Sequence, residues 1–511
     1  MDIEINTDFK KALNLLEGEK NLFITGRAGT GKSTFLKYFC ENTKKQFVLL
    51  APTGVAAVNI GGQTIHSFFR FKPGVTLDEA EKIGKRNQKN KLYQKLELLI
   101  IDEISMVRAD LFDCVDIFLK KARKNNLPFG GVQLLFIGDL YQLPPVERAE
   151  EKESFKRVYE SPYFFSGRAM KELTLEIIEF EKIYRQKDSR FINLLNKVRN
   201  KSIEEEDIHK LNERYIKDFD EKEYQDHIYL TTRNLQADEV NGRNLDRLKE
   251  KKFIFTAESD GEFERNLHPA EEILILKKGA RVMFLNNDKF NRWINGSLGW
   301  VKKINKEKII VAVDGGGEEE VEQYTWEINE NYFDQEIKII KRRTIGSFTQ
   351  VPLKLSWAIT IHKSQGKTFD KVVIDIGRGT FTSGQAYVAL SRCRSFEGIV
   401  LKAPLKKNHI WLDWRVMQFL TNFQYKLAKK ELSDEKKELL IRQAIEKKQK
   451  IEIIYLKAKD EKSKRIILPK KLQMEEYNGH DYLALTAYCF LRTGERIFNV
   501  KRIIQIKQIV L

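Results

Sequence analysis

The stretch Gly26-Arg27-Ala28-Gly29-Thr30-Gly31-Lys32-Ser33 lies between a strand-like segment at 21–25 and a helix-like segment at 34–39. Its spacing matches the G-x-x-x-x-G-K-[ST] pattern of a phosphate-binding loop. Glycines let backbone N–H groups close around phosphate oxygens at a helix N-terminus, where Lys32 reaches the β- and γ-phosphates and the Ser33 hydroxyl holds Mg²⁺. The alternative is an accidental match in a Gly-rich turn. The strand and helix favour a nucleotide site made by Gly26, Ala28, Gly29, Thr30, Gly31, Lys32, Ser33 and Thr34.

The composition indicates a multidomain protein with a polyanionic partner. At 511 residues the chain is long enough for three or four domains, and 42% hydrophobic residues are enough to build their cores. The formal net charge is +17. Nucleic acid is the natural partner for such a charge, although a solvated surface rich in both Lys and Glu is the plain alternative.

Cysteine usage and hydropathy point to a reducing compartment. Cys40, Cys114, Cys393 and Cys489 lie far apart and form no C-x-x-C pair, so neither a zinc ribbon nor a disulfide framework is indicated. The N-terminal residues lack the basic and apolar regions of a signal peptide. No apolar run approaches the ~18 residues that a membrane span needs. We therefore expect a soluble cytoplasmic protein that does not associate with membranes.

Short apolar runs followed by helical patterns predict an α/β fold. The runs at 47–50, 98–101 and 132–137 have the composition of strands buried on both faces of a parallel sheet. A second α/β stretch opens near 228–232 and resumes at 358–361 and 372–376. Between them, residues 297–350 alternate β-branched residues with Gly and charges, which predicts a small inserted β-barrel. Charged helix from 427 to 450 predicts a linker into a separate C-terminal domain.

Two carboxylates end the apolar run at 98–101. Asp102 and Glu103 should emerge at the C-terminal edge of the sheet, beside the phosphate-binding loop. One carboxylate can hold Mg²⁺ through water while its neighbour polarises the attacking water, as phosphoryl transfer to water requires. A helix cap next to a solvated residue is the alternative for an Asp-Glu pair.

Three polar residues elsewhere are candidates for sensing the γ-phosphate. Gln142 lies in the Pro-rich loop 138–145 after the next buried run, a loop that could equally be a structural turn. Arg185 and Arg392 are candidate arginine fingers, because charge on the γ-phosphate must be neutralised in the transition state. In isolation, each Arg is more often a surface residue.

The order of these motifs resembles that of superfamily 1 helicases of the 5′-to-3′ branch, and within it the petite-integration-frequency (Pif) helicases. The resemblance covers roughly residues 15–420. The matching stretches are 26–33, 51–57 with 63–68, 101–106, 138–145, 184–186, 358–368 and 386–392, together with a signature segment that runs from 110–112 through 128–133.

This resemblance implies two RecA-like cores that clamp ATP, with Gln142, Arg185 and Arg392 sensing the γ-phosphate and Gly366 and Lys367 at the nucleotide. It places seven residues on motifs that track single-stranded DNA: Pro52, Thr53, Gly54, His66, His362, Lys363 and Ser364. The barrel at 297–350 corresponds to a Src-homology-3-like insertion, and 69–95 to an insertion carrying a strand-separating wedge. His66 and His362 could instead be satisfied core residues. The Gln-containing adenine motif of the family is not evident, with Asn6 and Phe9 as stand-ins.

The last eighty residues resemble a WYL domain, a small β-rich barrel of bacterial regulators. The matching pieces are 451–455, 465–469, 482–485 and 493–503, although Asp481 replaces the Trp of the name. Aromatic faces combined with cations suit stacked bases and phosphates. The candidate DNA-binding residues are Tyr455, Arg465, Tyr482, Arg496 and Arg502. A basic barrel that only braces the motor is the alternative.

We therefore predict two RecA-like P-loop NTPase cores, at 1–170 and 171–426, followed by a linker and WYL-like domain at 427–511. The predicted activity is ATP- and Mg²⁺-dependent 5′-to-3′ unwinding of DNA, by a monomer acting on single strands and tailed or forked duplexes in DNA repair or recombination. One rival is a translocase that strips proteins without separating strands. The other is a DNA-binding regulator in which nucleotide acts as a switch.

Overall fold

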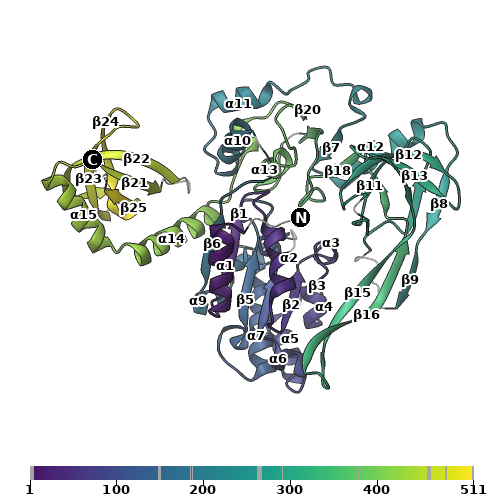
Figure 1. Ribbon diagram of the computed structural model, residues 1–511, viewed down its shortest axis with the longest axis horizontal. Coiled ribbons are helices and arrows are strands. Elements are labelled where there is room, and N and C mark those ends of the chain that lie inside the picture. The colour runs from purple at the N-terminus through teal and green to yellow at the C-terminus, as the bar shows by residue number, and fades with distance from the viewer. Residues whose placement is uncertain are drawn as a thin grey trace. The chain divides into compact units, whose positions relative to one another are not determined.

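The computed structural model describes residues 5–147, 151–184, 186, 188–261, 268–290, 292–377, 379–456, 462–477 and 480–508. The chain divides into two compact units (Figure 1): Met1–Asn196 with Glu204–Trp411, and Lys197–Ile203 with Leu412–Leu511. No helix in the described ranges has the length and apolarity needed to cross a membrane.

A six-stranded parallel sheet forms the first core of the larger unit, in the order β3-β2-β4-β5-β1-β6. Its strands are β1 (Leu22–Gly26), β2 (Phe47–Ala51), β3 (Gln63–Thr64), β4 (Leu98–Ile101), β5 (Gln133–Ile137) and β6 (Glu176–Phe180). β1, β4 and β5 are buried along their whole length. Burial on both faces is typical of a parallel sheet covered by helices, so the apolar runs are explained and the α/β prediction is confirmed.

The helices of this core include one that begins directly at the phosphate-binding loop. They are α1 (Thr7–Glu17), α2 (Lys32–Asn42), α3 (Gly54–Asn59), α4 (Ile65–Phe69), α7 (Ala109–Arg123), α8 (Lys152–Lys156) and α9 (Ala169–Glu172). Phe9, Phe35 and Phe180 pack together from α1, α2 and β6, with ring centroids 5.1 to 5.6 Å apart. Truncating one of these buried rings to Ala would cost about 3–5 kcal/mol, so the cluster holds α2 firmly against the sheet.

The segment at 69–95 contains two helices, α5 (Leu77–Arg86) and α6 (Lys91–Lys95). A capping box between Thr76 and Glu79 starts α5. Gly84 lets α5 lie close to α7, since a Cβ at this position would come within 2.7 Å of the Phe118 carbonyl oxygen. The segment predicted to carry the wedge is thus fastened to the first core.

The second core is a four-stranded parallel sheet in the order β18-β7-β19-β20. Its strands are β7 (Ile228–Thr231), β18 (Ala358–Thr360), β19 (Val372–Asp375) and β20 (Ile399–Leu401), and the helices near it in the chain are α10 (Ser189–Arg199), α11 (Glu205–Asn212), α12 (Asn234–Arg247) and α13 (Gln385–Leu390). More than a hundred residues of the chain separate β7 from β18, its neighbour in the sheet. That arrangement matches an insertion into a second RecA-like core.

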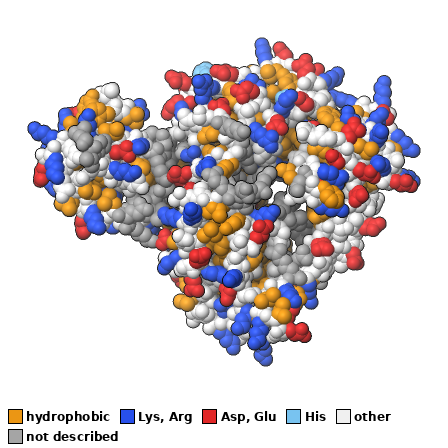
Figure 2. Space-filling view, viewed as in Figure 1, with side chains coloured by type: hydrophobic (Ala, Val, Ile, Leu, Met, Phe, Trp, Pro, Cys, Tyr) orange, Lys and Arg blue, Asp and Glu red, His pale blue; other side chains and the backbone are white. Residues whose placement is uncertain are grey.

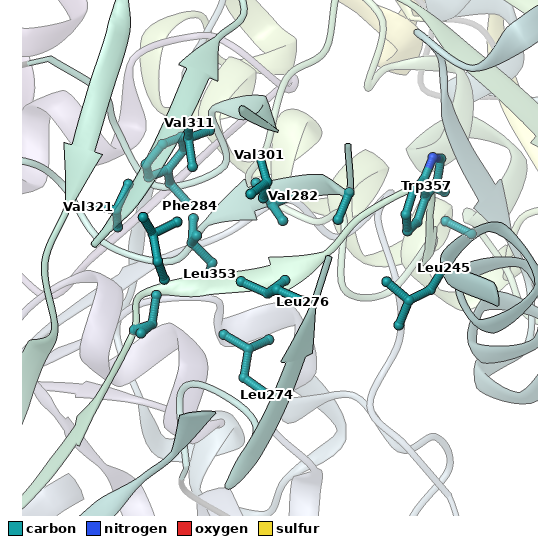
Figure 3. Packing of buried hydrophobic residues seen from close by; sticks show 14 of the residues in the cluster. Leu245, Leu274, Leu276, Val282, Phe284, Val301, Val311, Val321, Leu353 and Trp357 are labelled. Carbon is teal, nitrogen blue, oxygen red and sulfur yellow. The ribbon is translucent and has the colours of Figure 1, made fainter. Parts of the chain in front are cut away.

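The inserted strands are antiparallel and extend on both sides of the predicted stretch at 297–350. They are β8 (Phe253–Thr256), β9 (Glu258–Gly261), β10 (Ile273–Leu276), β11 (Arg281–Phe284), β12 (Leu298–Ile304), β13 (Ile309–Val313), β14 (Glu318–Val321), β15 (Tyr324–Asp334), β16 (Ile339–Gln350) and β17 (Leu353–Leu355). Figure 3 shows Val301, Val311 and Phe284 of the insertion in one cluster with Leu245 of α12 and Trp357. The insertion and the second core therefore share one hydrophobic core.

The long hairpin of β15 and β16 also contacts the first core, and in Figure 1 it runs past α6. The Asn331 amide donates to Gln63 Oε1 at 2.6 Å. Arg70 and Arg343 both pair with Glu330, at 3.0 and 2.7 Å. The insertion therefore has polar contacts to β3 and to the segment that follows α4.

The smaller unit carries five antiparallel strands in the order β24-β23-β22-β21-β25. Its elements are α14 (Trp414–Glu431), α15 (Asp434–Glu446), β21 (Ile451–Leu456), β22 (Lys462–Tyr477), β23 (His480–Cys489), β24 (Gly494–Asn499) and β25 (Ile503–Gln508). Ile441 of α15 packs on Ile453, Leu485 and Phe498 of the sheet. The predicted small β-rich domain is present with its own core, and α14 belongs to this unit.

Candidate nucleotide and DNA sites

The phosphate-binding loop joins β1 to α2 in a conformation that depends on glycine. Gly29 and Gly31 have φ of 81° and 85°, in the left-handed region. At Gly26, φ is 150° and a Cβ would lie 2.6 Å from the Phe180 carbonyl oxygen. Glycine at these positions therefore permits the compact loop that turns backbone N–H groups toward a phosphate.

Lys32 lies over this loop. Its ammonium donates to the carbonyl oxygens of Gly26 and Arg27, at 2.8 and 2.9 Å. Thr30 donates its hydroxyl to the Arg27 carbonyl, which closes the loop from inside. A lysine at the first residue of α2 places its charge where phosphate oxygens bind to a helix N-terminus.

Asp102 and Glu103 follow β4, as the sequence predicts. Asp102 accepts a hydrogen bond from the Glu103 backbone N–H at 2.9 Å, and Glu103 has a left-handed φ of 50°. Burial raises the pKa of Glu103 to about 7, and the neighbouring Asp102 charge adds to this, while Lys32 and Arg392 act in the opposite direction. Burial also raises the pKa of Asp102. A carboxylate with a pKa near neutrality suits a general base.

Gln142 and Arg392 are both buried. Gln142 donates to Asp139 Oδ2 at 3.2 Å, and a Cβ at Gly384 would lie 2.5 Å from the Gln142 carbonyl oxygen, so loops of the two cores touch here. Arg392 donates to the carbonyl oxygens of Val388 and Lys367, at 2.9 and 3.2 Å. Its charge still reaches Glu103, whose pKa it lowers. Arg185 lies outside the described residues.

Two residues to which the sequence assigned no role connect the cores at this site. Gln365 of the second core donates to Glu103 Oε2 at 3.3 Å. The Tyr387 hydroxyl accepts a hydrogen bond from the Ala28 backbone N–H at 3.2 Å. Both residues fall inside the helicase-like stretches at 358–368 and 386–392, but nothing in the local sequence indicates that their side chains cross between the cores.

The two stand-ins for adenine recognition have structural roles. Asn6 caps α1 by accepting from the Phe9 N–H, and its amide donates to the Tyr184 hydroxyl at 3.2 Å. Phe9 is 2% exposed and belongs to the hydrophobic core. Tyr184 in turn donates its backbone N–H to the Gly29 carbonyl at 2.8 Å. This N-terminal cluster therefore supports the phosphate-binding loop.

The residues expected to track DNA lie after the strands of both cores. Pro52, Thr53 and Gly54 follow β2, and the Thr53 hydroxyl accepts from the Ala56 N–H at 3.2 Å. His66 lies on α4, and burial lowers its pKa, as it does for His362.

His362 stacks on the exposed ring of Phe381, with centroids 5.9 Å apart. Lys363 is exposed. Ser364 is fully buried and donates to the Ile361 carbonyl at 2.7 Å, so its hydroxyl is not presented to a strand.

Gly366 turns the same loop, with φ of 79°. Lys367 directs its ammonium to Asn295 Oδ1 of the insertion at 2.7 Å. The geometry therefore gives Lys367 a partner on the insertion rather than in the phosphate-binding loop.

In the smaller unit, only some of the five candidates meet. The Arg465 guanidinium lies 5.8 Å from the Tyr455 ring centroid and 5.6 Å from that of Phe498. Within the part of the chain that the structure describes, no carboxylate lies within 4.0 Å of Arg465. Tyr482 donates its hydroxyl to Glu475. Arg496 and Arg502 lie on β24 and on the turn before β25.

Comparison with protein families gives two matches. Residues 4–209 match the model of the PIF1-like helicases, and residues 439–508 match the WYL domain. The chain is 33% identical over 434 residues to the ATP-dependent DNA helicase Pif1 of Bdellovibrio bacteriovorus, covering 83% of this chain and 93% of that protein. It is 36% identical over 395 residues to the human ATP-dependent DNA helicase PIF1, of which it spans 58%.

Solved structures show the same likeness. Bacteroides sp Pif1 in complex with ADP-AlF4 superposes with a TM-score of 0.75 at 37% identity, covering 83% of this chain and 98% of that one. Bacteroides Pif1 bound to ssDNA has a TM-score of 0.58 at 37% identity, covering 82% and 96%.

Proposed function

We infer that this chain, which belongs to the PIF1-like helicase family, is an ATP-dependent DNA helicase that carries a C-terminal WYL domain. We further propose that it moves 5′-to-3′ along single-stranded DNA as a monomer and unwinds tailed or forked duplexes. The proposed direction rests on the family, since no single residue specifies it.

The contact between Gln365 and Glu103 is the observation that carries this proposal. It brings the second core onto the carboxylate that polarises water in the first core. Tyr387 and Ala28 make a second connection beside the phosphate-binding loop. Because both cores contribute to one site, a change at the nucleotide alters the contact between the cores, as a motor requires.

The donor set fits Mg²⁺. Burial raises the pKa of Asp102 and of Glu103. Within the described residues, neither carboxylate forms an ion pair within 4.0 Å that would offset this burial. Hydroxyl and carboxylate oxygens are the ligands that Mg²⁺ prefers. We propose that Ser33 and Asp102 hold the ion, which neutralises phosphate charge when bound.

Each residue of the site has a separate role in ATP hydrolysis. Lys32 binds the β- and γ-phosphates, Glu103 takes the proton of the attacking water, and Gln142, Arg185 and Arg392 surround the γ-phosphate. Arg392 must exchange its bonds to the Val388 and Lys367 carbonyls for phosphate oxygens, which couples loop position to nucleotide state.

We propose that the WYL domain binds nucleic acid through Tyr455 and Arg465, whose stacked arrangement leaves the guanidinium without a carboxylate partner among the described residues. Residue type alone assigns three further residues to this proposed surface: Tyr482, Arg496 and Arg502. We also propose that the chain divides into three parts: 1–170, 171–426 and 427–511.

The deciding experiment measures ATP hydrolysis with and without single-stranded DNA, and then unwinding of duplexes with a 5′ or a 3′ tail. We expect DNA-stimulated hydrolysis and unwinding of the 5′-tailed duplex only. DNA-stimulated hydrolysis without unwinding would favour the translocase. A rate of hydrolysis that DNA does not change would favour the nucleotide-switched regulator.

A further inference from the structure

The turn that starts α13 in the second core packs on the backbone of the loop that carries Gln142 in the first core. Gly384, the residue before α13, is buried and has a φ of 73°, in the left-handed region. A Cβ at this position would lie 2.4 Å from the Tyr141 carbonyl oxygen and 2.5 Å from the Gln142 carbonyl oxygen. Glycine is therefore required here both by the backbone conformation and by the close approach of the two cores.

The turn at Gly384 is held from behind. The Gly384 backbone N–H donates to the Trp411 carbonyl oxygen at 3.3 Å. Gln385, which is 1% exposed, accepts a hydrogen bond from the Phe381 N–H through Oε1 at 3.1 Å. The turn therefore cannot move away from the Gln142 loop without losing these hydrogen bonds.

The Gln142 loop at 138–145 is confined on its other side. Gly138 begins this loop, and a Cβ there would lie 3.0 Å from Ile104 Cγ2. Ile104 directly follows Glu103, so the loop lies between the segment after Glu103 and the turn at Gly384. Its position, and with it the position of the Gln142 side chain, is therefore set by close contacts on both sides.

The helix α13 connects this contact to the rest of the nucleotide site. Every residue of α13 is buried. Its Tyr387 hydroxyl accepts a hydrogen bond from the Ala28 N–H of the phosphate-binding loop at 3.2 Å. Arg392 follows the C-terminal end of the helix. One short buried element thus contacts the phosphate-binding loop and the Gln142 loop and leads into Arg392.

We propose that Gly384 is a positioning residue for ATP hydrolysis. By letting α13 lie against the backbone of Tyr141 and Gln142, Gly384 sets the distance of the Gln142 side chain from the γ-phosphate. This inference rests on the proposed function, in which Gln142 lies at that phosphate. In this role Gly384 acts through Gln142 and not on the nucleotide itself.

The first test is Gly384→Ala in the full-length chain. Ordinary van der Waals contact begins at 3.4 Å, so a Cβ at 2.4 Å requires the two backbones to separate by about 1 Å. Because a misplacement of about 1 Å can cost on the order of 10²-fold in rate, kcat for DNA-stimulated ATP hydrolysis should fall on the order of a hundredfold.

Nucleotide binding separates positioning from general damage to the fold. ADP has no γ-phosphate, so the affinity of Gly384→Ala for a fluorescent ADP should stay within about twofold of the wild-type affinity. Aluminium fluoride with ADP mimics the transferring phosphate, and its binding should weaken about tenfold or more, because transition-state mimics depend on the positioned groups.

Gly377→Ala is the matched control. Gly377 lies in the same connection between β19 and α13 and has a left-handed φ of 55°, but a Cβ there would meet nothing within 4 Å. This variant carries the backbone cost without the contact and should hydrolyse ATP as the wild type does. Gln142→Ala tests the route: combined with Gly384→Ala, it should be no slower than the slower single variant, whereas independent effects would multiply.

Three results would overturn the proposal: a kcat of Gly384→Ala equal to that of Gly377→Ala, an equal loss of affinity for ADP with and without aluminium fluoride, or multiplicative effects in the double variant. If thermal unfolding shows that Gly384→Ala does not fold, Gln385→Met decides. It removes the acceptor of the Phe381 N–H at similar side-chain length and should lower kcat about two- to twelvefold with ADP affinity unchanged. An unchanged kcat in this variant would also overturn the proposal.

The same measurements distinguish failure of the proposed function. If DNA does not change the rate at which the wild type hydrolyses ATP, the proposed function fails. The comparison of Gly384→Ala with Gly377→Ala still tests the positioning role, because it uses hydrolysis and nucleotide binding that do not require DNA.

Discussion

Replacing Glu103 by Gln tests the chemistry at the nucleotide site most directly. Glutamine has nearly the same shape, and its carbonyl oxygen can still accept the hydrogen bond from Gln365, which is 3.3 Å long in the wild type. The variant should therefore fold and bind nucleotide. It cannot take a proton from water, so hydrolysis should fall by about 10²- to 10⁴-fold, which is about 3–5 kcal/mol of barrier.

The pH profile sharpens this test. With a pKa of about 7, Glu103 is mostly protonated at pH 6 and mostly ionised at pH 8. Because only the carboxylate accepts a proton, kcat/KM for ATP should rise through this range in the wild type, by about tenfold per pH unit on its acid side. The Gln variant should lose this dependence. Steady-state hydrolysis at saturating DNA measures both effects, and fluorescent ADP binding checks the fold.

Two results would refute this reasoning. Near-normal hydrolysis by Glu103→Gln would show that another group positions the water. A wild-type profile that is flat from pH 6 to 8, at unchanged nucleotide affinity, would contradict the raised pKa of Glu103.

Four further changes are informative. Tyr387→Phe removes the hydrogen-bond acceptor of the Ala28 N–H. It should raise KM for ATP about two- to twelvefold in steady-state kinetics, which corresponds to the loss of one neutral hydrogen bond. An unchanged KM would show that this contact is absent from the enzyme that binds ATP. Asp102→Asn should raise the Mg²⁺ concentration that gives half-maximal hydrolysis on the order of tenfold to a hundredfold in a metal titration. An unchanged Mg²⁺ concentration would show that Asp102 holds no ion. Truncation after Trp411 removes most of the smaller unit and should weaken DNA binding most at low salt while hydrolysis persists; equal affinity would leave a bracing or small-ligand role for the WYL domain. Gly130→Ala should lower the free energy of unfolding by about 1–3 kcal/mol in thermal unfolding, because φ is 62° and the Cβ would lie 2.6 Å from the Leu119 carbonyl oxygen. Gly74→Ala is the control: φ is 77° there but the surrounding space is open, so this variant measures the cost of the left-handed backbone alone.

The net charge of the chain does not locate its binding surface. The net charge of +17 predicts a polyanionic partner. On the face shown in Figure 2, however, Lys and Arg side chains are interspersed with Asp and Glu, so net charge alone does not locate a binding surface. Burial separates cations that a charge count treats alike: Lys354 and Lys367 are partly buried, and burial lowers the pKa of each, whereas Lys363 is exposed.

The features that could be predicted from the sequence depend on local backbone rules. The glycines at 26, 29 and 31 are required by the conformation of the loop, and the apolar run at 98–101 places Asp102 and Glu103 at the end of a strand. These signals span a few residues, where φ preferences and strand periodicity act directly.

Which distant residues complete the site depends on how the chain packs in three dimensions. Gln365 reaches Glu103 across 262 positions of sequence, and Tyr387 reaches Ala28 across 359. The extent of the insertion, from Phe253 to Leu355, and the partner of Lys367 were likewise set by packing. Such contacts depend on how two cores and a shared hydrophobic cluster fit together, because side-chain packing joins segments whose local sequences carry no signal for one another.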